Sequence, residues 1–284
     1  MGKCFSILKN KIICNNNNYT ILKTYKKTNT KIIYLNYSQN ENSFYIVKKN
    51  KKNSFYNEIY IINKISKLNN KHIINFFKPP DINNNSIFLE YCIYGDLFDI
   101  FQNKNISTNT SVNIFKIIIN TLNTIYKKFK ISHRDIKLEN ITLNKDGYIK
   151  IIDWGCSGTD INYLKKFGTI NYRAPEIIEK RKYFGQYIDV WACGVLFFIM
   201  VCGILPMTEK KNCYYRKTIY NSNWKLFWHV SKKNINIKLS DDFKNIIENI
   251  FNYDINKRIS LDDLDKKKIY YNKLSNYEIK KNLI

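Results

Sequence analysis

The sequence predicts an α+β protein in which a β-rich N-terminal part precedes a larger, mainly helical C-terminal part. Short apolar segments rich in Ile and Tyr fill the region before residue 50, and segments with helical apolar spacing dominate after residue 110. Between them lies a β-hairpin pattern beside several charged residues. With 284 residues, 44% of them hydrophobic, the chain is long enough for one large domain or two packed lobes.

The first predicted elements are three strands and a helix. Runs rich in β-branched and aromatic residues at 19–25, 32–35 and 43–47 predict the strands. The helix is predicted because apolar residues after Glu58 recur on one helical face, at Ile59, Ile61, Ile62 and Ile65.

The central segment 133–140 reads His-Arg-Asp-Ile-Lys-Leu-Glu-Asn, and an Asp-Gly turn signal and then Asp153-Trp-Gly follow it. The flanks of the turn alternate apolar and polar residues, which predicts a β-hairpin. Because a hairpin brings its ends together, Asp135, Lys137 and Asn140 should lie beside Asp153. Oxygen ligands for Mg²⁺ next to a cation suit phosphoryl transfer from a nucleotide.

The C-terminal part is predicted to contain three main helices. Apolar spacing indicates a helix over 111–130, and Ser240 with two aspartates caps another that ends near Phe251. Between them, the apolar segment 189–206 is long enough to raise a transmembrane alternative, but we interpret it as a buried core helix. We expect an irregular segment at 224–230 and a basic C-terminal tail that is only loosely held.

The segment 133–155 resembles the catalytic and magnesium loops of the eukaryotic protein kinases. The resemblance implies the bilobal kinase fold over 19–284, with an N-lobe at 19–91 and a C-lobe at 92–284. It also implies transfer of the γ-phosphate of Mg-ATP to a serine or threonine hydroxyl of a protein. Asp135 would accept or orient the hydroxyl proton, Lys137 would steady the γ-phosphate, and Asn140 and Asp153 would hold Mg²⁺.

The N-terminal part carries further residues of this resemblance. Lys48, which ends Tyr-Ile-Val-Lys, would bind the α- and β-phosphates of ATP and pair with Glu58, the single acidic residue between Lys48 and Asp81. Leu89 would be the gatekeeper of the adenine pocket. The resemblance further implies that the backbone of two residues binds adenine, Glu90 and Cys92.

The phosphate-binding loop departs from the kinase pattern. Lys26, Thr28 and Lys31 stand at the three positions where the family has glycine. Glycines allow backbone N–H groups to approach phosphates, so side chains here should hinder that approach, although the lysine charges compensate in part. An alternative reading is therefore a pseudokinase that binds nucleotide weakly and acts as a membrane-tethered scaffold.

The remaining family positions concern the architecture of the C-lobe. Thr169 is expected to tie Asp135 to Lys137, and this pair favours Ser/Thr over Tyr specificity. Asp189 is expected to accept hydrogen bonds from the catalytic-loop backbone, and Arg258 is expected to form an ion pair with Glu176.

Two features of the magnesium and activation loops stand apart. Trp154 replaces the usual phenylalanine of the magnesium loop, and its indole N–H should find a backbone acceptor. Arg134 is the residue that would contact an activating phosphate. Lys165 occupies the most frequent phosphate position, which leaves three alternatives, Ser157, Thr159 and Tyr163.

The formal charge of +24 favours anionic partners such as nucleic acid, acidic protein or the inner membrane leaflet. A/T-rich codon bias toward Lys, Asn and Ile could supply much of this charge, and no interleaved aromatic-basic pattern indicates RNA binding, so we expect no nucleic-acid partner and a monomer. Asp96 and Glu139 occupy positions where related kinases meet basic substrate residues. The seven cysteines show no regular spacing, which favours a reducing compartment.

Residues 1–18 form a predicted lipidation and basic segment with a short linker. Gly2 follows Met1 and Ser6 lies four positions beyond it, which fits the myristoylation pattern, and Cys4 is placed for palmitoylation. A myristoyl chain alone binds membranes only with a constant of about 10⁴ M⁻¹. We therefore expect two lipid signals and attachment to the cytoplasmic face of a membrane.

Overall fold

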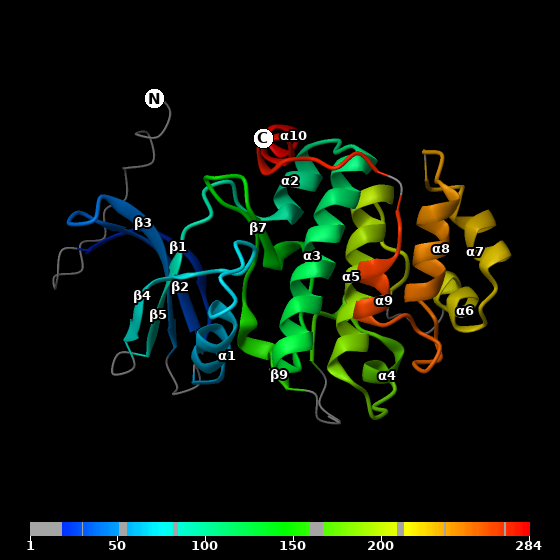
Figure 1. The fold of residues 1–284 in the computed structure, drawn as a ribbon, viewed down its shortest axis with the longest axis horizontal. Coiled ribbons are helices and arrows are strands. Elements are labelled where there is room, and N and C mark those ends of the chain that lie inside the picture. The colour runs from blue at the N-terminus through cyan, green and yellow to red at the C-terminus, as the bar shows by residue number, and fades with distance from the viewer. Residues whose placement is uncertain are drawn as a thin grey trace. The chain divides into compact units, whose positions relative to one another are not determined.

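The computed structural model in Figure 1 describes residues 19–29, 31–50, 56–81, 85–159, 167–208, 213–235, 237–269 and 271–284. The chain forms two compact units. The first comprises residues up to Lys67 together with Ile74–Ile93, and the second comprises Leu68–Ile73 with Tyr94–Ile284. The chain thus passes between the units at Ile93 and Tyr94, close to the expected lobe boundary. Gly2, Cys4, Tyr163 and Lys165 lie outside the described residues.

Within its described residues, the first unit is an antiparallel sheet with one helix. The strands follow the order β1-β2-β3-β5-β4. The elements are β1 (Tyr19–Lys27), β2 (Lys31–Ser38), β3 (Ser43–Asn50), α1 (Tyr56–Ser66), β4 (Phe76–Asp81) and β5 (Ser86–Glu90). The three predicted N-terminal strands are confirmed, and each is longer than the apolar pattern indicated because the hydrogen-bonded register continues through polar residues.

The core of the first unit follows from two periodicities. Tyr45 and Val47 alternate along β3 and are buried, and the Tyr45 ring stacks on Phe77 of β4 with centroids 4.5 Å apart. In α1, Ile61 and Ile65 are also buried, four positions apart on one helical face. Strand period and helix period therefore supply the two apolar surfaces that this unit needs.

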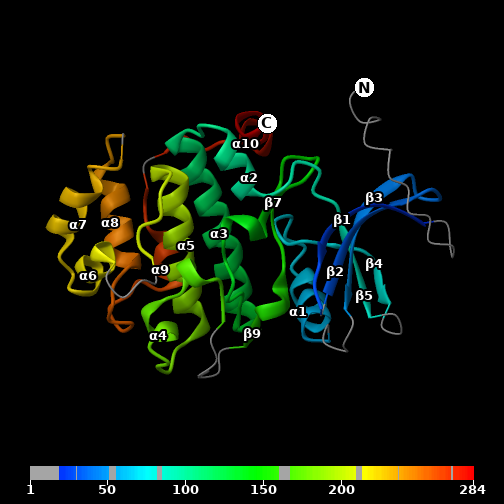
Figure 2. The same ribbon diagram turned by 180° about the vertical axis from the view of Figure 1, so that it is seen from behind.

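The second unit is mainly helical (Figure 1 and Figure 2). Its described elements are α2 (Leu97–Asn103), α3 (Thr108–Phe129), β6 (Ile131–Ser132), η1 (Leu138–Asn140), β7 (Ile141–Leu143), β8 (Ile149–Ile151), η2 (Trp154–Cys156), β9 (Gly158–Thr159), η3 (Ile170–Tyr172), α4 (Pro175–Ile178), α5 (Gly185–Cys202), α6 (Tyr214–Tyr220), α7 (Trp224–Ser231), α8 (Asp241–Ile250), α9 (Leu261–Lys266) and α10 (Asn276–Leu283).

Two long helices, α3 and α5, pack against each other in the second unit. Helix α3 starts three residues before the predicted position, because the Ser107 side chain accepts a hydrogen bond from the Thr110 N–H and caps the helix there. Among the described residues, α5 is the one helix long and apolar enough to cross a membrane, but 72% of it is buried inside the protein. This agrees with its interpretation as a core helix.

The predicted hairpin at the centre of the sequence is confirmed. Strands β7 and β8 pair in register, Ile141 opposite Ile151. The Asn144 carboxamide oxygen accepts the N–H groups of Asp146 and Tyr148 and so closes the turn. The turn is therefore set by side-chain hydrogen bonding as well as by the Asp-Gly pair.

Two predictions about the C-terminal part are wrong. Segment 224–230 is not irregular but forms α7, which is capped by Asn223 and buries Phe227. The C-terminal tail is not loosely held, because it forms α10 with a capping box between Ser275 and Glu278. The apolar residues of α10 become buried only against distant parts of the chain, so the basic composition of the tail hid its packing.

Candidate active site

Asp135 is held from three directions in the second unit. Its Oδ1 accepts the Thr169 hydroxyl at 2.8 Å and the Thr169 N–H at 2.9 Å, while its Oδ2 lies 3.2 Å from the Lys137 ammonium. Lys137 also donates to the Thr169 hydroxyl at 2.7 Å. The expected contacts among Asp135, Lys137 and Thr169 are thus confirmed. The carboxylate remains partly exposed, as a group that meets substrate must be.

A buried carboxylate of α5 orients the backbone of this loop. Asp189 accepts the N–H of His133 at 2.6 Å and the N–H of Arg134 at 2.7 Å. Arg134 has φ of 67°, a left-handed conformation that costs energy for a non-glycine residue. Charge-assisted hydrogen bonds to Asp189 offset that strain, so the predicted role of Asp189 in accepting these bonds is confirmed.

His133 links the catalytic loop to the segment that carries Asp153, and sequence reasoning did not single it out. Its ring is buried, lies with Nε2 2.9 Å from the Ile152 carbonyl oxygen and accepts the Asp135 N–H at Nδ1. The ring also packs edge-on against Trp154, with centroids 4.5 Å apart. The signal was available in the sequence, because His133 directly precedes the Arg-Asp pair.

Asn140 and Asp153 come from the two ends of the hairpin. The Ile152 N–H donates to the Asn140 carbonyl at 2.9 Å, which brings the residue before Asp153 beside Asn140. The Asn140 amide donates to the Asp135 carbonyl oxygen at 2.7 Å, and Asp153 has a left-handed backbone with φ of 61°. The hairpin was predicted to bring Asp135, Lys137 and Asn140 beside Asp153. The nearness of Asn140 to Asp135 and to the residue before Asp153 is confirmed, and the approach of Asp153 to Asp135 and Lys137 stays a prediction.

The oxygen atoms at this site suit Mg²⁺. No group of three or more His, Cys, Asp or Glu side chains suitable for a metal occurs within the described parts of the chain. A carboxylate and a carboxamide oxygen are nevertheless the hard ligands that Mg²⁺ takes when substrate phosphates and waters complete its octahedron. Asp153 and Asn140 therefore fit a magnesium-nucleotide complex better than a metal ion bound by protein alone.

Trp154 is fully buried, and its indole N–H donates to the Ile151 carbonyl oxygen at 3.2 Å. The predicted backbone acceptor for this N–H is confirmed. Because the same side chain packs against His133, the residue after Asp153 is anchored by both polar and aromatic contacts.

The Arg134 side chain is buried beside the loop that follows Trp154. Its Nη2 donates to the Thr159 carbonyl at 2.6 Å, and its guanidinium lies 5.3 Å from the centroid of the Phe167 ring. Gly158 faces the same guanidinium so closely that a Cβ would lie 2.8 Å from Nη1. Ser157, one suggested phosphorylation site, is buried and donates to the His133 carbonyl, so its hydroxyl is not accessible in this conformation.

Glu176 and Arg258 form the expected buried ion pair. The two guanidinium nitrogens donate to the two carboxylate oxygens at 2.6 and 3.0 Å. The pair joins α4 to the segment after α8 and is fully buried.

The first unit contains the other predicted ion pair. Lys48 of β3 donates to Glu58 of α1 at 2.7 Å, and both residues are buried. The predicted pairing is confirmed. Leu89 is buried in β5, where it lies opposite Ile46 and Phe76. The two residues predicted to bind adenine through their backbone lie at and just beyond the end of this strand. The Glu90 N–H donates to the Asn75 carbonyl, and the Cys92 side chain is buried.

The β1–β2 hairpin holds the three residues at the glycine positions. Thr28 closes the turn, because its N–H and its hydroxyl both donate to the Lys31 carbonyl, at 2.9 and 3.1 Å. The Lys31 N–H in turn donates to the Thr28 hydroxyl at 3.0 Å. Lys26 is exposed in β1. Two amides of this turn are therefore engaged within the hairpin, which sequence reasoning did not anticipate.

Comparison with known proteins places these residues in a family context. Residues 19–269 match the protein kinase domain. A carbon catabolite-derepressing protein kinase of Secale cereale is 31% identical over 228 residues, which cover 78% of this chain and 43% of that protein. The SNF1-like protein kinase ssp2 of Schizosaccharomyces pombe is 36% identical over 157 residues, 52% of this chain and 26% of its own length.

A further relative, the serine/threonine protein kinase OSK3 of Oryza sativa subsp. indica, is 35% identical over 147 residues, 49% of this chain and 28% of that protein. The chain therefore spans less than half of the length of these relatives.

Proposed function

We propose that this chain, which belongs to the protein kinase domain family, is an active serine/threonine kinase that transfers the γ-phosphate of Mg-ATP to a protein hydroxyl. The observation that carries the proposal is how the Asp135 carboxylate is oriented and exposed. Its carboxylate is oriented by Thr169 and Lys137 yet remains partly exposed. Such a carboxylate can accept the hydroxyl proton while the neighbouring ammonium offsets the charge of the phosphoryl group.

The roles of the other residues follow from their chemistry. Asn140 and Asp153 would hold Mg²⁺, which when bound neutralises charge on the phosphates. Lys48 would contact the α- and β-phosphates while its hydrogen bond to Glu58 orients the ammonium. The contact of Lys137 with the Thr169 hydroxyl supports transfer to Ser or Thr. The relative OSK3, which is named a serine/threonine protein kinase, points the same way.

The phosphate hairpin would act through side-chain charge. Because Thr28 and Lys31 use their amides to close the turn, these N–H groups are engaged inside the hairpin. The ammonium groups of Lys26 and Lys31 would replace them as phosphate ligands, while Thr28 would act by closing the turn. The same observation favours a second candidate, a pseudokinase scaffold with weak nucleotide binding.

The decisive experiment measures phosphate transfer from Mg-ATP to a generic basic protein, with Asp135→Asn as the comparison. The parent should transfer phosphate, and the variant should be slower by about 10²–10⁴-fold, the usual contribution of a general base, with nucleotide binding retained. A well-folded parent that transfers nothing at millimolar ATP would support the scaffold instead. Binding of a fluorescent nucleotide then measures how strongly the β1–β2 hairpin still binds nucleotide.

The substrate is proposed to carry basic residues near the phosphorylated hydroxyl. Burial raises the pKa of Asp96, the Asp99 N–H counteracts this, and the charges of Asp99 and Glu139 raise it further. Glu139 Oε2 is itself buried without a hydrogen-bond partner among the described residues. Carboxylates that repel one another in this way would gain from a substrate Arg or Lys.

Peptide kinetics test this preference. The variant Asp96→Asn keeps an N-cap residue for α2 but loses the charge. It should raise KM for an Arg-containing peptide and leave KM for an Arg-free peptide unchanged. Because the pKa of Asp96 is raised, affinity for the basic peptide should be full above that pKa and decline on acidification sooner than for an ordinary carboxylate. Equal KM values for both peptides at all pH values would contradict the proposal.

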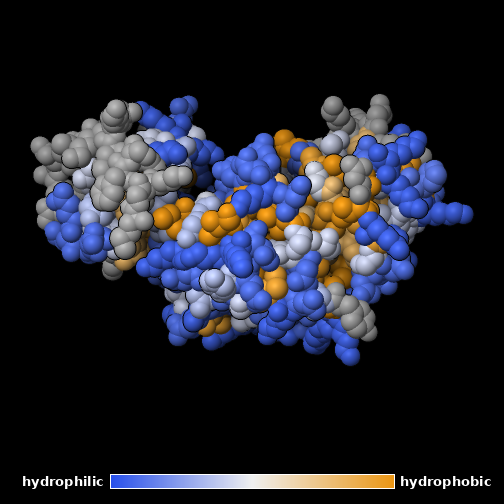
Figure 3. All heavy atoms as spheres, turned by 90° about the horizontal axis from the view of Figure 1, so that it is seen from above, coloured by the Kyte–Doolittle hydropathy of each residue, from blue (hydrophilic) through white to orange (hydrophobic). Residues whose placement is uncertain are grey.

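A hollow beside the catalytic loop, lined by apolar residues together with polar ones such as Lys104 and Asn105, would take a bulky substrate side chain. It has a volume of about 690 Å³, and Leu138, Phe98, Phe101 and the end of α5 line it. Figure 3 shows apolar atoms gathered over a face of this second unit. Since Leu138 lies between Lys137 and Glu139, the same peptide could reach the hollow and the carboxylates, and replacing its apolar residues by Ala should raise KM.

Membrane attachment is proposed from the Met-Gly-Lys-Cys start of the sequence, with myristoylation at Gly2 and palmitoylation at Cys4. Two acyl chains give stable anchoring, while one does not. In cell fractionation, Gly2→Ala should move the protein from the membrane to the soluble fraction. A variant that stays with membranes as fully as the parent would contradict this proposal.

A further inference from the structure

The C-terminal helix α10 lies beyond residue 269, where the match to the kinase domain ends. It is nevertheless part of the second unit. Its Ile279 and Leu283 are buried, and it contacts α3. The Asn282 amide donates to the Thr110 hydroxyl of α3 at 2.9 Å. Figure 1 and Figure 2 both show α10 near α2 and α3.

The segment before α10 is held against α3 by hydrogen bonds between its backbone and the side-chain carboxamides of two α3 asparagines. The Asn272 N–H donates to the Asn109 carboxamide oxygen at 2.9 Å, and the Asn109 amide donates back to the Asn272 carbonyl oxygen at 3.0 Å. Asn113 repeats this arrangement with the Leu274 N–H and the Asn272 carbonyl. Helix α10 therefore has a defined position against the start of α3.

Helix α10 also meets the turn of the β7–β8 hairpin. Lys280 donates to the Lys145 carbonyl oxygen at 2.6 Å. Gly147 in the same turn faces the Asn276 carbonyl so closely that a Cβ would lie 2.6 Å from its oxygen, and its φ is +86°. Glycine is thus required here both by its backbone conformation and by the closeness of α10.

The same lysine contacts the point where the chain enters the second unit. The Lys280 ammonium lies 4.9 Å from the centroid of the Tyr94 ring. Tyr94 donates its N–H to the Leu143 carbonyl oxygen, and the Leu143 N–H donates to the Gly95 carbonyl oxygen. Lys280 therefore contacts both the turn at Lys145 and the entry segment at Tyr94. The entry segment is itself hydrogen-bonded to Leu143, which lies just before the turn.

These contacts matter for the site because of the shortness of the hairpin. Strand β7 directly follows Asn140, and β8 ends two residues before Asp153. Each strand has only three residues, so a displacement of the turn is transmitted along a short, rigid ladder to the two proposed magnesium ligands.

We propose that Lys280 is a positioning residue for magnesium-nucleotide binding, which it supports by fixing the β7–β8 turn and the Tyr94 segment. This inference rests on the proposed function for its kinetic consequence, but its structural content does not. Helix α10 is then a functional extension of the kinase domain rather than a disposable tail.

The test compares Lys280→Met, which keeps most of the aliphatic stem, with Lys281→Met, an exposed lysine on the same helix. At saturating ATP, Lys280→Met should raise the half-saturating Mg²⁺ concentration about three- to tenfold, the effect of losing one charge-assisted hydrogen bond and one cation–π contact. The peptide KM should be unchanged. Lys280→Arg should restore most of the loss, and Lys281→Met should behave as the parent.

Hydrogen exchange gives a readout that does not depend on activity. In Lys280→Met, the amides of Tyr94 and Leu143 should exchange about tenfold faster, while those of β6 keep their rate, because the loosening is local. Unchanged exchange at these two amides would overturn the proposal. If the amides exchange faster but the parent transfers no phosphate, the positioning role of Lys280 stands and only the proposed function is contradicted. Gly147→Ala, which pushes α10 from the turn, should accelerate the same amides.

Discussion

Two buried ion pairs, one in each unit, differ in the geometry of the cation that forms them. In the second unit, Arg258 pairs with both oxygens of Glu176, and both side chains are 0% exposed. Its remaining donors reach the carbonyl oxygens of Asn252 and Tyr187. In the first unit, Lys48 contacts one oxygen of Glu58, with exposures of 5% and 4%.

The difference shows why one buried cation is suited to holding the fold together and the other to binding a ligand. A guanidinium is a rigid fork, and in Arg258 each of its three nitrogens donates to at least one acceptor. An ammonium is a compact charge on a flexible stem, so the donors of Lys48 are not fixed in one plane as those of a guanidinium are. We therefore interpret the Arg258 pair as structural and the Lys48 pair as suited to a phosphate.

The largest expected effect is on the structural pair. Arg258→Met leaves the Glu176 carboxylate buried and uncompensated, and it should lower the free energy of unfolding by about 3–5 kcal/mol. Urea denaturation measures this loss. Arg216→Met, in which a partly exposed arginine beside the Tyr220 ring is replaced, serves as the control and should cost less than about 1 kcal/mol. Similar losses in both variants would remove the contrast between buried and surface arginines.

The second prediction replaces both members of the other pair. The double variant Lys48→Met, Glu58→Leu should change the free energy of unfolding by less than about 1 kcal/mol, because apolar residues of similar volume often replace a buried pair without loss. Phosphate transfer should nevertheless fall by about 10²–10³-fold, as when a preorganised donor is removed. Unfolding curves and single-turnover rates measure the two effects. Retained transfer would show that Lys48 is not a phosphate ligand.

A smaller effect is expected at the β1–β2 hairpin, where Lys26 is exposed and Lys31 is partly buried. Replacing Lys26 and Lys31 together by Gln should raise KM for ATP by about two- to fivefold, since exposed ion pairs contribute about 0.2–1 kcal/mol each. The dependence of KM on salt should also weaken. Lys23→Gln, which alters the lysine over the Tyr25 ring in the same strand, is the control. An equal effect of Lys23→Gln would mean that only general positive charge matters.

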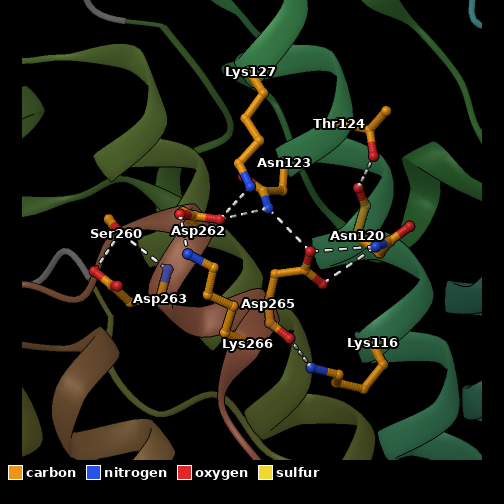
Figure 4. A network of polar contacts seen from close by, with 10 residues as sticks. All are labelled: Lys116, Asn120, Asn123, Thr124, Lys127, Ser260, Asp262, Asp263, Asp265 and Lys266. Carbon is orange, nitrogen blue, oxygen red and sulfur yellow. Dashed lines mark hydrogen bonds and ion pairs between the residues drawn. The ribbon is translucent and has the colours of Figure 1, made fainter.

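The smallest effect concerns an exposed network between α3 and α9, shown in Figure 4. Asp262 pairs with Lys127 and Lys266, whose side chains are 54% and 69% exposed. Hydrogen bonds from these lysines hold the pKa of Asp262 well below its usual range. Its stabilising contribution is therefore present above the pKa of an unfolded aspartate, about 3.9, and is lost as pH falls through the folded-state pKa.

Asp262→Asn should accordingly lower Tm slightly at neutral pH and low salt. The difference should vanish near 1 M salt, where the Debye length is about 3 Å. Thermal unfolding of the parent, of this variant and of Asp146→Asn, an exposed turn residue, measures it. A Tm difference that persists at high salt would place this network with the buried pairs.

Much of the site could be predicted because it lies in contiguous motifs. The hairpin after Asn140 follows from its alternating pattern around an Asp-Gly turn. The pairing of Lys48 with Glu58 and the contact of Asp189 with the catalytic loop are what the resemblance to the protein kinases implies. The start of α3 was misplaced because the predicting pattern was apolar spacing, whereas the cap at Ser107 is polar. Helix α7 was missed although Trp224, Phe227 and Trp228 have helical spacing, because their aromatic character was given more weight than their period.

The sequence by itself determined the fold class, the kinase resemblance and the identity of the charged residues, because these depend on local periodicity and on motifs of a few residues. The tertiary structure decided which hydrogen-bonding groups are already used and which surfaces are covered. Thr28 closes its own hairpin, Ser157 is buried, and α10 packs on α3 and on the β7–β8 turn. Burial and hydrogen-bond satisfaction depend on residues more than a hundred positions apart, such as Lys280 and Lys145, and no local pattern contains that information.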